Sequence, residues 1–336
     1  MNSFGRIFRV NIFGESHGEG VGVVIDGCPA GLPLSLDDFL PDLERRKGGT
    51  QKGTTPRQEE DLPIFKSGLF KDKATGAPIT ILFENKNIRS SDYEKQRDFP
   101  RPGHADFVAH KKFGGFEDYR GSGHFSGRLT VGLVAAGALA KKILNTSKSK
   151  IEIKSTILEI GGEKDLEKGL QKAIDAKDSI GGIIECRVSG LPIGLGEPFF
   201  DSVESLISHI VFAIPAVRAV EFGTGFAAAK MFGSEHNDAI VNEGGQTRTN
   251  HAGGVVGGLT NGNEFVFRIA IKPTSSTPKE QNSLNWETGK AENFSVKGRH
   301  DLCIALRVPV VLEAVTAIVF ADLMLLEQHI KRIIDY

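Results

Sequence analysis

Two spacings of apolar residues alternate along the chain and predict a mixture of strands and helices. Apolar residues at alternate positions over 7–13, and an apolar run at 21–25, are typical of two strands. The segment that joins them, GESHGEG at 14–20, contains three glycines and is expected to turn. Four more segments have the composition of strands, namely residues 79–83, 151–160, 183–189 and 264–271.

Helices are expected between these strands. Ser35 precedes two aspartates and starts a helix that ends in the basic run 45–47, before a pair of glycines. Ser126 starts a helix rich in alanine and glycine, which we expect to pack closely against its neighbours. Three more helices are expected at residues 164–177, 201–213 and 308–334. The order strand, helix, strand, helix recurs in both halves, although no sequence repeat accompanies it.

Nothing in the pattern divides the chain into separate domains. No low-complexity tract or clean linker interrupts residues 1–336, and the polar stretches 48–62 and 85–103 are interpreted as loops within one unit. Forty of the 336 residues are glycine, against about 7% in an average protein. We therefore expect a single α+β domain with many tight backbone contacts.

Composition excludes several classes of protein. The 41 basic and 42 acidic side chains nearly cancel, so no overall charge draws the chain onto nucleic acid or an anionic membrane. The longest apolar stretch, 308–326, contains Glu313 and Asp322, which favours a buried helix over a membrane span. Residues 1–13 lack the features of a signal peptide. Three dispersed cysteines form no metal-binding pattern and suit a reducing cytoplasm.

Histidine and glycine occur together unusually often. Five of the nine histidines lie within two residues of a glycine, and these are His17, His104, His124, His251 and His300. Glycine allows a ligand to approach the backbone closely, and imidazole exchanges its proton near neutral pH. The pattern indicates a site, although a turn histidine bonded to nearby backbone would explain His17 equally well, and a solvated surface side chain would explain His104.

Several segments carry the donors that an anion requires. The segment GSGHFSGR opens directly into the Ser126 helix, whose N-terminal amides and dipole favour an anion. Arg101 in RPGHAD and Lys272 in KPTSS are cations close to further donors. In contrast, GTGFAA at 223–228 matches a dinucleotide-binding pattern, but the apolar run after it is too short for the crossover helix. Together these segments favour a large pocket for a phosphorylated cofactor and a second anion.

Eight ordered motifs over nearly the full length resemble the chorismate synthase family. They are GESHGEGVGVVIDGCP, RRKGG, RPGHAD, DYRGSGHFSGR, GLGEPFFD, NHAGGVVGG, KPTSS and KGRHD. The resemblance implies a cytoplasmic lyase that converts 5-enolpyruvylshikimate 3-phosphate to chorismate and phosphate by anti 1,4-elimination. It also implies reduced FMN, without net redox change, and NADPH in members that reduce their own flavin. A β-α-β sandwich in one large domain, a pseudo-twofold organisation and a homotetramer are implied as well.

The resemblance also assigns roles to residues by motif position. His17 is expected to be the acid near the departing phosphate, His104 the proton donor to the flavin, and Asp301 the partner of flavin N5 in removing the C6 proton. The implied flavin contacts are His124, Phe125, Ser126, Ala216, Gly257, Lys272, Pro273, Thr274, Ser275, Ser276 and Arg299. The implied contacts to substrate or NADPH are Ser16, Arg46, Lys52 and Arg128. No metal is implied.

The motifs differ from the usual family pattern at four places. HFSGR stands where many members have RSSAR, so that His124 and Phe125 replace an arginine and a serine. Lys52 replaces a frequent arginine, Pro215 replaces an asparagine, and Leu302 replaces a proline. Two other functions remain open from the sequence. One is an NADPH-dependent flavin reductase, and the other is a flavin- or phosphate-binding module without catalytic activity.

Overall fold

Two antiparallel sheets form the framework of the protein. The computed structural model describes residues 2–49, 52–55, 59–87, 98–296 and 300–334. The first sheet has the order β1 (Ser3–Phe4), β2 (Arg9–Gly14), β3 (Gly20–Asp26), β7 (Ile79–Glu84), β4 (Ile64–Ser67). The second has the order β10 (Val217–Phe222), β13 (Phe265–Ile271), β9 (Gly182–Ser189), β8 (Glu152–Ile160). All neighbouring strands in both sheets pair antiparallel, so no parallel βαβ crossover is needed.

The two sheets share one connectivity. Counted along the chain from β2 and from β8, the strands of each sheet lie in the order first, second, fourth, third. In each half a helix follows the second strand, α1 (Leu40–Arg46) or α5 (Val203–Val211). A longer helix follows the fourth strand, α3 (Thr130–Leu144) or α7 (Val308–Leu326).

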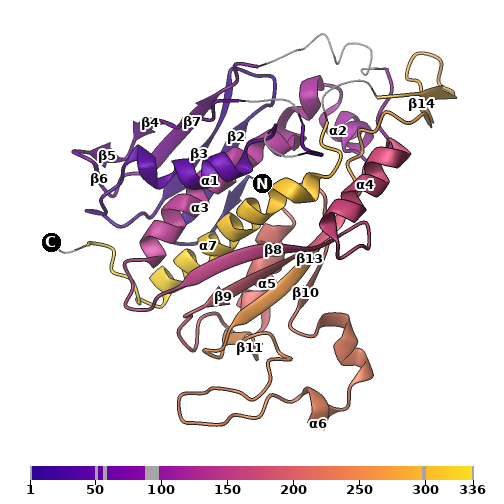
Figure 1. The fold of residues 1–336 in the computed structure, drawn as a ribbon. Coiled ribbons are helices and arrows are strands. Elements are labelled where there is room, and N and C mark those ends of the chain that lie inside the picture. The colour runs from indigo at the N-terminus through magenta and orange to yellow at the C-terminus, as the bar shows by residue number, and fades with distance from the viewer. Residues whose placement is uncertain (1, 50–51, 56–58, 88–97, 297–299, 335–336) are drawn as a thin grey trace.

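Helices α3 and α7 connect the two sheets (Figure 1). Helix α3 packs on β3, helix α7 packs on β8, and the two helices have their most extensive contact with each other. Gly137 makes this close approach possible, because a Cβ atom at this position would lie 2.2 Å from Ala314 Cβ on α7. The prediction that the alanine- and glycine-rich helix packs closely is therefore confirmed.

The final helix is buried, as its interrupting charges predicted. The apolar segment Ile304–Leu326 has the length of a membrane span, but 94% of its most apolar 18-residue stretch is buried inside the protein. Its two carboxylates have internal partners. Asp322 accepts hydrogen bonds from the backbone N–H groups of Arg6, Ile7 and Phe8 at 2.7 to 2.9 Å. Glu313 accepts from both terminal nitrogens of Arg45 at 2.7 and 2.8 Å.

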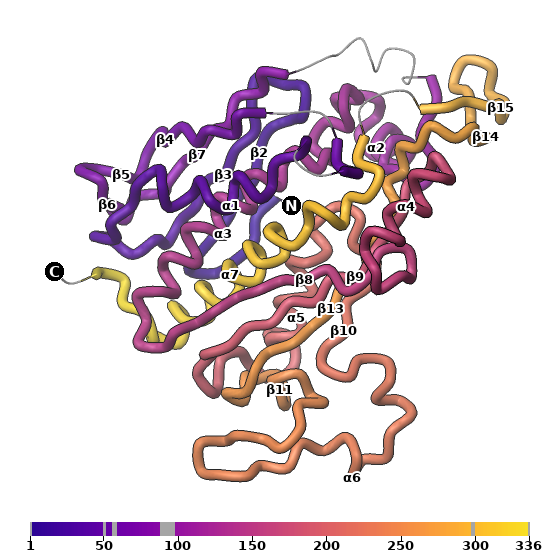
Figure 2. Tube along the Cα trace, viewed as in Figure 1, coloured from indigo at the N-terminus to yellow at the C-terminus, as the bar shows by residue number. Residues whose placement is uncertain are grey.

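Smaller elements surround this framework. These are α2 (Asp106–Phe113), α4 (Leu166–Ala176), α6 (Gly233–His236) and the hairpins β5 (Leu69–Phe70) with β6 (Lys73–Ala74), β11 (Val255–Val256) with β12 (Leu259–Thr260), and β14 (Gln281–Leu284) with β15 (Ala291–Phe294). Short 3-10 turns include η3 (Arg120–Phe125), η4 (Gly127–Leu129), η5 (Phe199–Asp201), η6 (Gly225–Lys230) and η7 (Ile304–Arg307), besides η1 (Leu36–Asp38). Figure 2 shows the long path between β10 and β13, which extends away from both sheets.

The predicted elements are present, with one difference in length. The final helix was expected to reach residue 334, but it ends at Leu326. Gln328 adopts a left-handed conformation with φ 58°, and the chain then turns back so that Ile334 N–H donates to Ala30 O at 2.9 Å. Helix α2 and the strands β1 and β4 of the first sheet are among the elements that were not expected. The segment GTGFAA forms η6 rather than a crossover helix, which confirms that the dinucleotide-binding pattern is accidental.

Candidate active site

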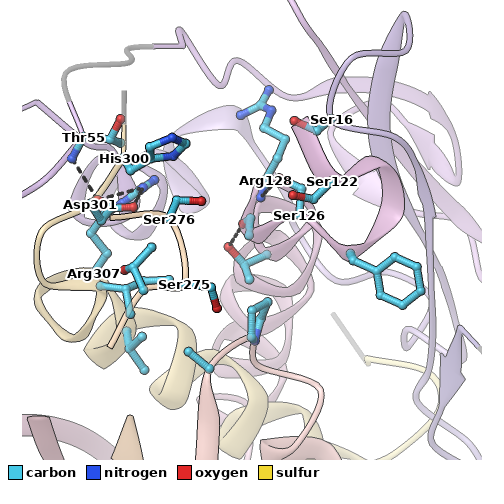
Figure 3. A pocket seen from close by; sticks show the side chains of 18 of the residues that line it. Ser16, Thr55, Ser122, Ser126, Arg128, Ser275, Ser276, His300, Asp301 and Arg307 are labelled. Atoms are coloured by element: carbon cyan, nitrogen blue, oxygen red, sulfur yellow. Dashed lines mark hydrogen bonds and ion pairs between the residues drawn. The ribbon is translucent and has the colours of Figure 1, made fainter. Parts of the chain in front are cut away.

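One cavity of about 460 Å³ gathers most of the predicted site residues. The first half of the chain lines it with Ser16, Arg46, His104, Phe125, Ser126 and Arg128, and the second half with Ala216, residues 272–276 and Asp301. Figure 3 shows Asp301, Thr55 and Arg307 on one side, facing Ser16, Ser122, Ser126 and Arg128 on the other. The cavity therefore forms only when both halves have folded.

The His17 turn lies against the glycines of η3. Ser16 N–H donates to Gly123 O at 3.1 Å, and Ser16 lines the cavity. The imidazole of His17 is 5% exposed and contacts Gly121, which also lines the cavity. A Cβ atom on Gly121 would lie 2.1 Å from His17 Nδ1, and Gly121 has φ 55°, so glycine is required here for two independent reasons.

Arg46 and Arg128 share a buried carboxylate. Arg46 Nη1 donates to Asp61 Oδ2 at 2.9 Å, and Arg128 Nη1 donates to Asp61 Oδ1. Burial opposes ionisation of Asp61, but the two guanidinium groups outweigh it and hold the pKa of the carboxyl below its usual range. Arg46 also donates to Thr130 Oγ1 at 3.0 Å. Its burial, offset in part by Asp61, lowers the pKa of Arg46 to about 9, so Arg46 stays charged at neutral pH.

Asn85 connects Arg128 to the turn that carries His17. Arg128 Nε donates to Asn85 Oδ1 at 2.9 Å, while Asn85 Nδ2 donates to Glu15 O and Gly18 O, each at 3.0 Å. One amide side chain thus fixes both an arginine and the backbone on either side of Ser16 and His17.

His104 lies in a network with Arg101 and Asp106. His104 Nδ1 is 2.6 Å from Asp106 Oδ1, and Arg101 donates to both oxygens of the same carboxylate at 2.7 and 2.8 Å. Burial alone would raise the pKa of Asp106, but hydrogen bonds from Arg101 and His104 outweigh it and hold that pKa far below its usual range. Asp106 is therefore ionised at neutral pH.

The segment KPTSS forms a wall rich in hydrogen-bond donors. Lys272 Nζ donates to Gly103 O and, at 3.0 Å, to Ser275 Oγ, while Arg101 Nη1 donates to Ser276 Oγ at 2.9 Å. Burial and the neighbouring charge of Arg218 lower the pKa of Lys272. Arg218 lines the same wall.

Asp301 is held from two directions. Thr55 N–H donates to Asp301 Oδ1 at 2.8 Å, and Arg307 Nη1 donates to Oδ2 at 3.1 Å. Arg307 Nε in turn donates to Arg46 O at 3.0 Å. These contacts orient the carboxylate at the cavity wall, next to His300. They also link it to the Arg46 and Asp61 network.

Besides His17, which contacts the lining residue Gly121, three predicted site residues in the described part of the chain do not line the cavity. His124 packs on Phe125, with ring centroids 4.3 Å apart, and does not line the cavity itself. Gly257 lies exposed in the turn between β11 and β12. Lys52 is exposed and donates to Gln171 Oε1 at 3.2 Å. Arg299 lies outside the described residues.

Sequence reasoning missed the carboxylate and amide that organise the site. Asp61 and Asn85 lie in or beside stretches interpreted as polar loops, where no spacing connects them to the arginines they bind. Arg307 was also missed, because it lies six residues after Asp301 in a segment without a recognisable pattern. Only tertiary contacts reveal these three residues.

A cavity with buried arginines, oriented imidazole and a fixed carboxylate defines an enzyme that acts on a small anionic ligand by proton transfer. The sequence matches the family model described as chorismate synthase over residues 8–325. The chorismate synthase of Chitinophaga pinensis is 71% identical over 333 residues, covering 99% of both chains. That of Methanocaldococcus jannaschii is 40% identical, covering 97% of this chain and 96% of its own.

A solved structure shares the fold as well. The crystal structure of a chorismate synthase superposes with a TM-score of 0.71 at 27% identity and covers 96% of this chain and 93% of its own. The chain belongs to the chorismate synthase family. It is accordingly a carbon–oxygen lyase of the shikimate pathway, which converts 5-enolpyruvylshikimate 3-phosphate to chorismate.

Proposed function

We propose that reduced FMN and 5-enolpyruvylshikimate 3-phosphate bind together in the cavity, and that His17, His104 and Asp301 manage the protons of the elimination. The observation that carries this proposal is the meeting of both halves of the chain at one cavity. The cavity includes Ser16, His104 and Asp301, and His17 packs directly against its wall at Gly121.

The chemistry of the walls fits a phosphorylated ring cofactor. Lys272, Arg218 and the hydroxyls of Ser275 and Ser276 supply the cations and donors that a phosphate requires. The flat ring of such a cofactor requires an apolar surface. The cavity provides one with the side chains of Phe125, Ile214, Pro215, Ile304, Val308 and Val311. The volume of about 460 Å³ lies within the usual range for ligand pockets of ~300–1,000 Å³.

Each proposed role follows from the surroundings of the residue. When bound, reduced FMN would supply electron density to the allylic system of the substrate, without net redox change. His17, fixed by Gly121 and the Asn85 network, delivers a proton to the leaving phosphate. Arg128 balances the charge of the anionic substrate. Asp301, oriented by Thr55 and Arg307, accepts the C6 proton.

An anaerobic assay of phosphate release tests this function. With dithionite-reduced FMN and no NADPH, the protein should turn over, whereas oxidised FMN under air should give no product. A flavin reductase without lyase activity would release no phosphate in the first arm. Turnover with oxidised FMN alone would refute the requirement for an electron-rich flavin.

Substitution of the two histidines tests their roles separately. His17→Ala and His104→Ala should each lower turnover by ~100-fold or more, because a positioned general acid contributes ~10²–10⁴-fold. FMN should still bind to both variants in a fluorescence titration. A module that only binds flavin would release no phosphate even before substitution. Near-normal turnover in both variants would refute the assignment of the two histidines.

Reduction of the flavin by NADPH is an activity separate from the elimination, and it requires its own test. Of the two contacts expected for NADPH, Arg46 is buried with its donors on protein partners, and Lys52 is exposed and donates to Gln171. We propose that this protein depends on flavin reduced elsewhere. An absorbance assay with NADPH and oxidised FMN, which should show no bleaching of the flavin, tests this point.

We further propose the assembly and organisation that the family resemblance implies. The shared connectivity of the two sheets supports a pseudo-twofold β-α-β sandwich in a single domain over residues 1–336. The resemblance implies a cytoplasmic homotetramer, and an interface between subunits is supported by exposed apolar side chains between β10 and β13, including Phe226, Phe232 and Ile240. Light scattering at micromolar concentration should give four times the mass of the chain.

A further inference from the structure

His104 and Asp106 form a pair in which only the histidine reaches the cavity. Of the described residues that line the cavity, His104 is one and Asp106 is not. Asp106 is the first residue of α2, two positions after His104, so the backbone holds the carboxylate behind the ring. The 2.6 Å contact joins His104 Nδ1 to Asp106 Oδ1. Nε2 is therefore the ring nitrogen left to exchange a proton with a ligand.

The contact distance decides which ring nitrogen carries the hydrogen. Asp106 is ionised and can only accept, so Nδ1 at 2.6 Å must donate to it. The alternative has Nδ1 accepting from Arg101 Nη2, which lies 3.2 Å away. That arrangement would place the nitrogen lone pair against a carboxylate oxygen, and its donor distance is longer. The geometry therefore favours hydrogen on Nδ1.

Arg101 is committed to this pair rather than to a ligand. Its Nε and Nη2 donate to both oxygens of Asp106, and its backbone N–H donates to Oδ2 at 3.0 Å. The remaining donors reach Ser276 Oγ at 2.9 Å and Ser122 Oγ at 2.8 Å. A bidentate guanidinium on this partly buried carboxylate fixes both its charge and its direction. Arg101 also ties the pair to KPTSS and to η3.

We propose that Asp106, held by Arg101, is a positioning residue that keeps hydrogen on His104 Nδ1, so that Nε2 faces the cavity as the proton-transferring atom. This inference deepens the role proposed above for His104 and rests on it. In Asp106→Asn, the amide must turn an N–H group either toward Arg101 or toward Nδ1. Because Oδ2 accepts from both the backbone N–H and Nε of Arg101, the amide oxygen is expected to keep that position and the N–H group to face Nδ1. Nδ1 must then accept a hydrogen bond and can no longer carry the hydrogen.

Nitrogen-15 NMR of histidine-labelled protein measures the tautomer directly. At a pH where the ring is neutral, His104 should show a protonated Nδ1 and an unprotonated Nε2, its signals being identified by their loss in His104→Ala. In Asp106→Asn we expect the Nδ1-protonated form to be lost as the major tautomer. Persistence of that form would overturn the proposal, whatever the activity shows.

Kinetic measurements distinguish a positioning role of Asp106 from a loss of folding in its variants. Asp106→Asn should lower kcat by ~10–100-fold, with the KM for the phosphorylated substrate changed less than about threefold, because the group acts through the catalytic histidine. Asp106→Glu should recover part of kcat. Unchanged kcat in Asp106→Asn, or a rise in KM that matches the fall in kcat, would contradict this role.

The same helix offers a matched control. Glu117 lies 3.1 Å from Nδ1 of His110 on α2, and neither residue lines the cavity. Glu117→Gln should leave kcat unchanged, and a loss equal to that of Asp106→Asn would indicate a general effect on α2. If His104→Ala retains normal turnover, the proposed role of His104 fails, while the NMR result still reports on positioning by Asp106.

Discussion

At the residue scale, the arginines of the site have a structural task that sequence motifs do not reveal. Arg46 was expected to contact substrate or NADPH, yet its guanidinium donates to Thr130, Asp61 and the carbonyl oxygens of Gly127 and Arg128. The group is buried and surrounded by acceptors of the protein itself. Its charge can act on a ligand through space, but its hydrogen bonds hold the wall of the cavity.

Asp61→Asn tests how far this wall depends on one carboxylate. The side chains of Asp61, Arg46 and Arg128 are 2%, 4% and 5% exposed, so removal of the negative charge leaves two buried cations uncompensated. We expect the free energy of unfolding to fall by about 3 kcal/mol, measured by urea denaturation. Glu60→Gln, which removes an exposed partner of Lys86, serves as the control and should have no measurable effect. An unchanged urea midpoint in Asp61→Asn would show that the network is dispensable.

Sequence motifs predicted which segments meet at the cavity, but not the residues between them. Ser16, His104 and Asp301 line it as expected because each lies in a glycine-rich motif with a chemical signature. Asp61 and Asn85 carry no such signature, since their partners are distant in sequence. Gly257 belongs to one of the predicted motifs but lies on an exposed turn. A motif specifies a local conformation, whereas the position of that segment relative to the cavity depends on the whole fold.

At the element scale, α7 shows how charged residues are accommodated inside an apolar helix. Glu313 accepts from Arg45 on α1, from Lys141 on α3 at 3.0 Å and from Ser155 N–H on β8 at 3.1 Å. The carboxylate thus joins three elements that pack around the helix. Burial opposes its ionisation, but hydrogen bonds from Arg45 and Lys141 hold the pKa of Glu313 below its ordinary value of 4.5.

This shift predicts a pH-dependent contribution to stability. Because the folded pKa lies below the unfolded value, the contribution is present above about pH 5 and is lost as the pH falls through the folded pKa. Glu313→Gln should lower the free energy of unfolding by about 1–3 kcal/mol at pH 7, a range reduced because Arg45 is half exposed. The difference from the wild type should shrink toward pH 3 in urea titrations. A constant difference over this range would show that charge is not the cause.

The sequence predicted the elements whose apolar spacing extends over many residues. It did not predict the elements whose position and length depend on tertiary contacts. Strands β2, β3, β7, β8, β9 and β13 and helices α3 to α5 follow from apolar spacing and capping residues, whereas the sheet strands β1 and β4 were not among the expected strands. Helix α2 was missed because its sequence, DFVAHKKF, leaves Phe107, Val108 and Phe113 exposed, so no apolar face marks it. The apolar residues after Leu326 imitate helical spacing, although Ile330 instead packs back into the core.

At the scale of the whole molecule, the cavity couples the two halves of the chain. Its walls come from the segments around Ser16 and Arg128 in the first half and around Lys272 and Asp301 in the second. A ligand that contacts both walls binds only the folded protein. Its binding energy is therefore added to the stability of the whole and not to that of either half.

Thermal unfolding with reduced FMN tests this coupling. At a ligand concentration of one hundred times Kd, stability should rise by about 2.7 kcal/mol, and both halves should unfold in one transition at a higher temperature. Intrinsic fluorescence of Trp286 and far-ultraviolet circular dichroism, recorded without oxygen, should give the same midpoint. Two separate transitions, with only one moved by the ligand, would show that the cavity belongs to a single half.

The contact of Asp322 with the amides of Arg6, Ile7 and Phe8 sets an order for biosynthesis. The ribosome releases the beginning of the first sheet more than three hundred residues before the carboxylate that satisfies those amides. The backbone N–H groups of these three residues consequently lack this hydrogen-bond acceptor until translation is almost finished.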